Sequence, residues 1–163
     1  MKEKHLPKDK KHISVKEAIK RMASFCAYQE RCQAEVRAKL TSEYDLNPDE
    51  IEFIIAELIS QGFINEERFA KIYAGSKFRV KKWGKLKIEQ ALKQFQLTNF
   101  CIEKGLAEIT DEEYETTLRE ILVKKSKILK ENNPLKRKQK LLQYALSKGY
   151  EMDIVLDLLD EYM

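Results

Sequence analysis

The stretch from residue 68 to residue 88 contains basic and aromatic side chains and no acidic one. Its cations are Arg68, Lys71, Lys77, Arg79, Lys81, Lys82, Lys85 and Lys87. Tyr73, Phe78 and Trp83 are interleaved with them. Ammonium and guanidinium groups in one segment suit contact with phosphates, with a carboxylate-rich protein surface, or with both. We predict that these eight cations form a binding face. The alternative is a solvated helix surface around a core tryptophan.

The spacing of the cations favours a partner of opposite charge. Lys77 and Lys81 share one stripe of a predicted helix at i, i+4, where like charges repel by a few tenths of a kcal/mol. A bound anion would offset that repulsion. Gly84 permits a bend before Lys85 and Lys87 begin the next predicted helix. A second, weaker basic patch comprises Lys136, Arg137, Lys138 and Lys140, and alone it is typical of a solvated helix start.

The net charge of +4 is unevenly distributed along the chain. Residues 13–62 are net acidic, whereas residues 63–108 carry a net charge of +5. A localised positive field indicates a polyanionic partner more clearly than a modest overall charge does.

The sequence contains no persuasive site for catalysis or for a metal ion. Its two histidines, His5 and His12, lie near the start of the chain, and no cysteine pairs with them at catalytic or metal-ligand spacing. A glycine-rich phosphate loop is also missing. We therefore expect a protein that is not an enzyme and has no catalytic residues, no cofactor and no metal.

The three cysteines, Cys26, Cys32 and Cys101, are an odd number without paired spacing, so they do not predict a disulfide framework. They are either redox sensors or, as we prefer for Cys26 and Cys101, small hydrophobic residues. Cys32 lies three residues before Glu35, where a capping Ser would be expected. The chain has no apolar run of about 18 residues and no apolar stretch typical of a signal peptide. We expect a cytoplasmic monomer that does not enter a membrane.

Charged residues make up 36 % of the chain, while glycine and proline number only 5 and 3, a composition that favours helices. Helix starts are marked by Ser14, Asn47, Thr110 and Asn133, and stops by Gly62 and Gly149. Apolar residues recur at helical spacing between these marks. They predict helices at about 14–28, 33–43, 48–61, 66–81, 84–95, 99–109, 111–131, 134–148 and 151–161. Residues 1–12 are expected to form a disordered basic arm.

The helices group in threes with a period of about 50 residues. Sliding the chain by 52 positions places Ala18 on Ala70, Tyr28 on Val80, Val36 on Ile88 and Leu40 on Leu92 without a gap. Such a period predicts stacked repeats that cover one another's apolar faces. We expect an all-α, elongated and curved tandem array of three three-helix repeats, at 13–62, 63–109 (the basic one) and 110–163.

The segment Asn65-Glu66-Glu67-Arg68-Phe69-Ala70-Lys71-Ile72-Tyr73 resembles the signature of the RecX family. Arg79, Trp83-Gly84-Lys85 and Ile88…Leu92 resemble its continuation, and Leu58 to Ile64 resembles its link between repeats. The resemblance covers about residues 14–160, is clearest over 54–92 and is weak after 110. Cys32 and Val36 depart from the family pattern, which often has Ser or Thr and Leu there.

The resemblance implies a regulator of homologous recombination and DNA repair. Members of the family bind the RecA recombinase on single-stranded DNA, lodge in the groove of its filament and restrain filament growth, ATP hydrolysis and strand exchange. Direct DNA binding is a further property that the resemblance implies. Two alternatives stay open from the residues alone: a generic DNA-binding helical protein, and a helical protein-binding scaffold.

Overall fold

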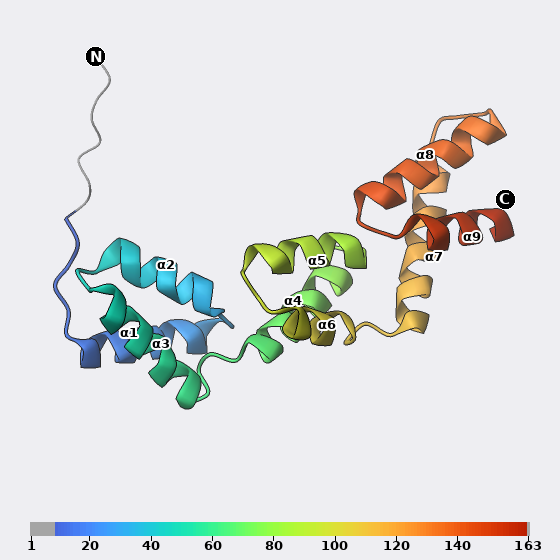
Figure 1. Cartoon of the computed structure of the whole chain (residues 1–163). Coiled ribbons are helices and arrows are strands. Elements are labelled where there is room, and N and C mark those ends of the chain that lie inside the picture. Colours follow the sequence, from blue (N-terminus) through green and yellow to red (C-terminus); the bar gives the residue numbers. More distant parts are fainter. Residues whose placement is uncertain (1–8, 163) are drawn as a thin grey trace, which may run out of the picture. The chain divides into compact units, whose positions relative to one another are not determined.

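The computed structural model describes residues 9–162, and within them the regular secondary structure is helical apart from one isolated β-bridge between Lys11 and Tyr44. The helices of this part of the chain (Figure 1) are α1 (Val15–Tyr28), α2 (Gln33–Glu43), α3 (Pro48–Ser60), α4 (Glu66–Arg79), α5 (Lys85–Gln94), α6 (Asn99–Leu106), α7 (Asp111–Ile128), α8 (Pro134–Ser147) and α9 (Met152–Tyr162). The predicted all-α tandem fold is confirmed. No helix among the described residues combines the length and the apolar content needed to cross a bilayer.

Side-chain caps begin the helices at the predicted positions. The Asn47 side chain accepts a hydrogen bond from the Glu50 N–H at 2.8 Å, and the Glu50 carboxylate accepts one from the Asn47 N–H at 3.1 Å. Thr110 and Glu113 form the same reciprocal arrangement at the start of α7. These bonds satisfy N–H groups that have no partner inside the helix, which is why the helices start here.

The helix ends follow both local and tertiary signals. Gly62 and Gly149 adopt φ values of +78° and +96°, as expected for glycines that stop helices. Helix α7 ends at Ile128 rather than at the predicted residue 131. The guanidinium of Arg137 donates hydrogen bonds to the carbonyl oxygens of Leu129 and Glu131, both at 3.1 Å. This clamp, absent from any local pattern, holds the chain after Ile128 out of the helix.

The chain divides between Phe69 and Ala70 into two compact units, and each is described by itself. The first unit contains α1, α2, α3 and the first turn of α4. Its core is built from Ala18, Met22, Val36, Leu40, Ile54, Ile55 and Leu58, all buried. Helices α1 and α2 both pack against α3.

The start of the described chain is attached to this first unit. The N–H of Lys11 donates to the carbonyl oxygen of Glu43 at 3.0 Å, and its carbonyl oxygen accepts from the N–H of Asp45 at 2.9 Å. The expected disordered arm therefore does not extend to residue 12, because Lys11 pairs with the end of α2. Residues 1–8 of that arm lie outside the described residues.

The second unit contains α4 from Ala70 onward and all of α5 to α9. Three buried aromatic rings cross it. Phe78 of α4 lies 5.8 Å from Tyr114 of α7, and Tyr114 lies 5.1 Å from Tyr150, which is fully buried between α8 and α9. The helices of the predicted second and third repeats thus share one core.

Residues that are 52 positions apart in the sequence are buried to a similar degree, each in its own unit. Ala18, Val36 and Leu40 are fully buried in the first unit. Their partners Ala70, Ile88 and Leu92 are fully buried in the second. The remaining pair, Tyr28 and Val80, is exposed at both positions, by 88 % and 71 %. Equivalent positions therefore have equivalent environments.

Candidate functional site

The turn between α4 and α5, which carries several predicted cations, is fixed to the loop between α8 and α9. The Gly84 N–H donates to the Lys148 carbonyl oxygen at 2.8 Å, and the Leu86 N–H donates to the Gly149 carbonyl oxygen at 3.0 Å. The Tyr150 hydroxyl donates to the Lys82 carbonyl oxygen at 2.9 Å. Three bonds from separate positions leave the turn little freedom to move.

The turn and the loop approach so closely that no side chain fits between them. A Cβ atom on Gly84 would lie 2.3 Å from the carbonyl carbon and oxygen of Gly149. These are backbone atoms that cannot swing away. The backbone conformation does not require a glycine here, since a φ of −75° is ordinary for any residue. Gly84 is required because another chain segment approaches it closely.

Lys82 occupies a left-handed backbone conformation, with φ of 60°. This region costs a non-glycine residue roughly 1–2 kcal/mol. The surrounding hydrogen bonds hold Lys82 there, and the Lys148 ammonium adds one more by donating to the Lys81 carbonyl oxygen at 3.3 Å. Such strain is common where a side chain must be presented in a set direction.

Trp83 in this turn is half-buried and lies between two ammonium groups. The Lys77 Nζ is 5.0 Å and the Lys87 Nζ is 4.6 Å from the centre of a ring of the tryptophan. Both distances are within the range of cation–π attraction. Trp83 is thus a platform that holds two lysines near each other.

Two of the predicted cations are neutralised by the start of α7. The Arg79 Nε donates to the Glu113 Oε1 at 3.0 Å, and this hydrogen bond is the main reason that the pKa of Glu113 lies below its ordinary value. The Lys85 Nζ lies 3.9 Å from the Asp111 carboxylate and 5.0 Å from the Tyr114 ring. Arg79 and Lys85 therefore connect α4 and α5 to α7.

Arg68 belongs to the first unit and has a partner there. Its guanidinium lies 2.8 Å from the Glu30 carboxylate and also donates to the Gly62 carbonyl oxygen at 3.0 Å. Arg68 therefore ties the start of α4 to the end of α1. Lys71, half-buried on α4, belongs to the second unit with the other predicted residues.

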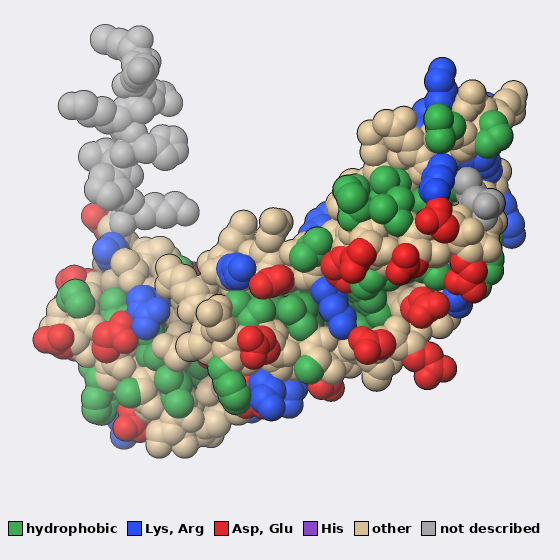
Figure 2. Space-filling model, turned by 45° about the vertical axis from the view of Figure 1, so that its right-hand side comes forward, with side chains coloured by type: hydrophobic (Ala, Val, Ile, Leu, Met, Phe, Trp, Pro, Cys, Tyr) green, Lys and Arg blue, Asp and Glu red, His purple; other side chains and the backbone are tan. Residues whose placement is uncertain are grey.

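The eight-residue face stays a prediction, but Arg68, Arg79 and Lys85 already have carboxylate partners, and Lys71 also has an interaction within the described residues. Four cations remain without a carboxylate partner among residues 9–162: Lys77, Lys81, Lys82 and Lys87. We call these four the lysine face. Acidic and basic side chains are interspersed on the side of the molecule that Figure 2 shows. We therefore define the lysine face by the ion pairs of single residues and not by the distribution of charge types over the surface.

Three of the four residues of the weaker patch on α8 have partners; Lys136 is exposed. Lys140 lies 2.8 Å from the Glu131 carboxylate, Lys138 pairs with Asp160, and Arg137 donates to the backbone clamp after α7. These residues stabilise the second unit rather than offering positive charge to a partner.

The sequence did not indicate a second group of lysines that the fold gathers in the second unit. Lys124 and Lys125 of α7 and Lys148 after α8 line one pocket of about 360 Å³ together with Lys82. The only local signal is the adjacent pair Lys124-Lys125. Lys82 and Lys148 join them only because the two turns are bonded together.

The two buried cysteines, Cys26 and Cys32, lack the lowered thiol pKa of a redox site. Burial raises the pKa of Cys26 to about 11 and that of Cys32 to about 12. Both thiols are therefore protonated and poorly nucleophilic at neutral pH. This supports the interpretation of Cys26 as a small hydrophobic residue, and Cys32 lies at the N-cap of α2, the predicted cap position.

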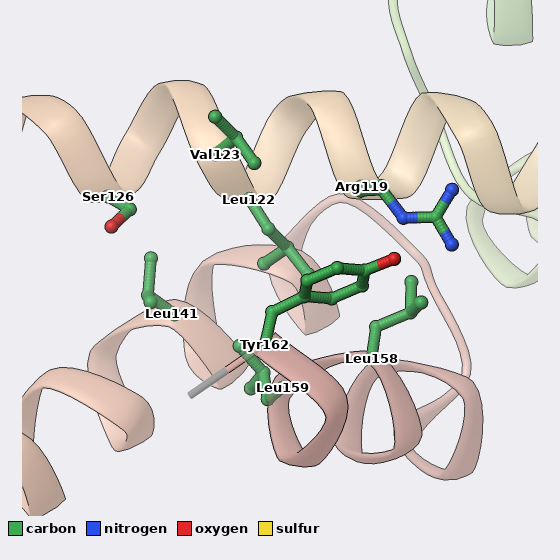
Figure 3. A pocket seen from close by; sticks show the side chains of 8 residues that line it. All are labelled: Arg119, Leu122, Val123, Ser126, Leu141, Leu158, Leu159 and Tyr162. Atoms are coloured by element: carbon green, nitrogen blue, oxygen red, sulfur yellow. The ribbon is translucent and has the colours of Figure 1, made fainter.

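An apolar pocket of about 100 Å³ lies among α7, α8 and α9 (Figure 3). Leu122, Leu141 and Leu158 line it, and the ring of Tyr162 extends across it in the view. Arg119 at its edge donates to Glu115 at 2.7 Å and lies 5.1 Å from the Tyr162 ring. The polar lining residues are Arg119, Ser126 and Tyr162, and the Ser126 hydroxyl oxygen accepts a hydrogen bond from Arg137 at 2.8 Å.

Two family models match the chain. Residues 65–106 match the second three-helix domain of RecX, and residues 111–159 match the third. Among solved structures, the crystal structure of RecX from Lactobacillus salivarius has a TM-score of 0.83 and 24 % identity, covering 90 % of this chain and 95 % of that one. The similarity to this crystal structure shows that the two chains share a fold.

Sequence relatives lead to the same family. The regulatory protein RecX of Clostridium acetobutylicum is 31 % identical over 148 residues, covering 88 % of this chain and 68 % of that protein. The protein of the same name from Clostridium perfringens is 33 % identical over 125 residues, covering 76 % and 58 %. The chain thus spans between about half and two thirds of the length of such relatives, since a third, from Listeria welshimeri, is covered over 52 %. The matched second and third three-helix domains, together with these identities, show that the chain belongs to the RecX family.

Proposed function

We propose that this protein regulates homologous recombination and DNA repair by binding the RecA filament on single-stranded DNA and inhibiting its extension, ATP hydrolysis and strand exchange. It acts by binding and performs no chemistry of its own. Family membership supports this proposal, and the relatives are named regulatory proteins. The observation that carries it is the lysine face, which lies on the end of α4, the fixed turn after it and the start of α5.

The arrangement suits a large polyanionic partner. Lys81 and Lys82 lie on the fixed turn, and Lys77 and Lys87 lie on the helices that flank it, so the backbone that carries all four is in place before binding. This lowers the entropic cost of binding. A filament offers the same contact many times, so weak contacts add through avidity. If all four lysines meet phosphates of a single strand, the log–log salt slope of binding is about −3.

The test measures ATP hydrolysis by RecA on single-stranded DNA with this protein at substoichiometric ratio. We expect inhibition by the natural protein. The variant K77E/K87E reverses two charges of the lysine face and should need at least about tenfold more protein for the same inhibition. The matched control K16E/K20E reverses two exposed lysines of α1 and should inhibit as the natural protein does.

Two results would overturn the proposal. One is no effect of the natural protein on hydrolysis, and the other is equal inhibition by K77E/K87E and the natural protein. Tight, salt-dependent binding to bare oligonucleotide without any effect on RecA would favour the generic DNA-binding alternative. Partner binding that ignores both salt and charge reversal would favour the scaffold alternative.

A further inference from the structure

The lysine-lined pocket on α7 and α8 is a site distinct from the lysine face, with which it shares only Lys82. Its cations are Lys82, Lys124, Lys125 and Lys148, and its one carboxylate is that of Glu120. None of the four lysines forms an ion pair with a carboxylate within residues 9–162, Glu120 included. The pocket therefore carries an excess of positive charge that the described part of the protein leaves uncompensated.

An aromatic ring holds two of these cations at the pocket. The Lys125 Nζ is 4.9 Å and the Lys148 Nζ is 5.9 Å from the centre of the half-buried Tyr144 ring. Lys148 is fixed further by its hydrogen bond to the Lys81 carbonyl oxygen. Their positions are thus set before any ligand arrives, which lowers the entropic cost of binding.

The crowding of positive charge has a cost that an anion would remove. The pKa of Lys148 is lowered, first by burial and second by the neighbouring charge of Lys87. Both effects disfavour its charged form. A ligand with several negative oxygens would reverse them by supplying the missing opposite charge.

The chemistry of the cations distinguishes between possible anions. The arginine fork binds carboxylates and phosphates through two parallel hydrogen bonds, whereas a lysine ammonium is a point charge that needs no planar partner. This pocket is lined by lysines and by no arginine. Ammonium groups converging from several directions suit a tetrahedral phosphate, whose oxygens accept from several donors at once.

We propose that this pocket binds closely spaced phosphate groups, supplied either by the backbone of single-stranded nucleic acid or by a free polyphosphorylated molecule. The aliphatic side chains of Ile121 and Ile128 also line it, and Ile128 is 68 % exposed. They provide an apolar floor on which a sugar or base attached to the phosphates can lie. Binding here requires no RecA.

The test uses the full chain without RecA and two probes, tripolyphosphate and a fluorescent oligothymidylate. The pocket variant K124Q/K125Q removes two charges, and the control K127Q/K130Q removes two exposed lysines nearby that do not line the pocket. We expect the pocket variant to bind at least one probe about tenfold more weakly. For the oligonucleotide, the salt slope should also shrink by about 1.4. The control should change affinity less than twofold.

The probes identify the source of the phosphates. Loss confined to the oligonucleotide indicates a nucleic-acid backbone, and loss of tripolyphosphate binding indicates a free ligand. Both results support the pocket. It is overturned if both variants bind both probes equally, or if only an oligoglutamate peptide responds to K124Q/K125Q. Circular dichroism checks that the variants fold. The single variant K124Q, at an exposed position, should bind the affected probe about threefold more weakly than the natural protein.

Failure of this inference is distinguishable from failure of the proposed function. The lysine-face variant K77Q should still bind tripolyphosphate as the natural protein does, because Lys77 does not line the pocket and is not among the charges that act on Lys148. Conversely, the RecA inhibition assay of K124Q/K125Q is a separate experiment. Its outcome does not affect the conclusion drawn from the binding of the two phosphate probes.

Discussion

Arginines and lysines have different roles in the second unit. Arg79 bonds to Glu113, Arg119 bonds to Glu115, and Arg137 bonds to the backbone after α7. The guanidinium fork is well suited to such fixed partners, whereas an ammonium group is a mobile point charge. Arg79 and Arg137 thus join separate elements, Arg119 pairs within α7, and the cations without a carboxylate partner in the lysine face are all lysines.

The approach of Gly84 to Gly149 makes a first prediction. The variant G84A places a methyl group 2.3 Å from backbone atoms, so one of the two segments must move. We expect the free energy of unfolding to fall by about 1–3 kcal/mol, the usual cost of overpacking. Urea denaturation followed by Trp83 fluorescence measures it, because Trp83 adjoins the substituted residue.

Gly75 supplies the control for this measurement. A Cβ there meets mainly the end of the flexible Arg79 side chain, whose displacement would weaken at most the exposed ion pair with Glu113, a loss of about 0–1 kcal/mol. Since alanine is favoured over glycine inside a helix by about 0.5–1 kcal/mol, G75A should be neutral or stabilising. Equal losses in G75A and G84A would contradict the account of a backbone collision.

The composition of the site was only partly predictable from the sequence. The acid-free run located the turn and the four lysines that remain uncompensated. It did not reveal that Glu30, Glu113 and Asp111 neutralise three other cations, because these partners lie 26 or more positions away in the chain. Contacts between distant segments depend on packing, which no local pattern encodes.

The helices were predicted more completely, because their starts depend on local chemistry. Asn47, Thr110 and Asn133 each cap a helix with a side-chain oxygen one turn or less away. Ends were less accurate where a distant residue intervenes, as Arg137 does after α7. The start of a helix is thus determined by residues a few positions away in the sequence, whereas the end of some helices depends on tertiary contacts.

The start of α7 makes a prediction about pH. Glu113 has a pKa below its ordinary value of 4.5, chiefly because of the hydrogen bond from Arg79, with a further contribution from the Thr110 N–H. A carboxylate with a depressed pKa in the folded state contributes stability above pH 4.5, and this contribution is lost as pH falls through the lower folded value.

The measurement compares the natural protein with E113Q between pH 7 and pH 3. We expect the loss of stability below pH 4.5 to be shallower in E113Q, because glutamine has no proton to take up. Urea midpoints at each pH provide the comparison. Identical acid profiles would show that the Arg79–Glu113 pair contributes nothing to folding.

The division into two compact units predicts that unfolding is not a single transition. Far-ultraviolet circular dichroism reports helices of both units, while the single tryptophan, Trp83, reports the second unit alone. Probes that follow different units need not give coincident curves. We expect the two urea transitions to differ in the natural protein.

A core substitution in the first unit sharpens this test. Leu40 is fully buried there, and L40A should destabilise that unit by about 2–5 kcal/mol. The circular dichroism curve should then shift while the Trp83 curve keeps its midpoint. If both curves shift by the same amount, the two units unfold together and the expectation is wrong.

The left-handed backbone at Lys82 allows charge and folding to be separated by one substitution. Glycine adopts this conformation without the cost that lysine bears, so K82G should unfold at the same or up to about 1 kcal/mol higher free energy. The same change deletes a cation shared by the lysine face and the pocket, so polyanion binding should weaken. Q96G, at the other such position among the described residues, should match it in stability and leave binding intact. Most charge deletions confound lost binding with altered folding. Here the backbone itself provides a variant that is expected to be sturdier and yet less able to hold its partner.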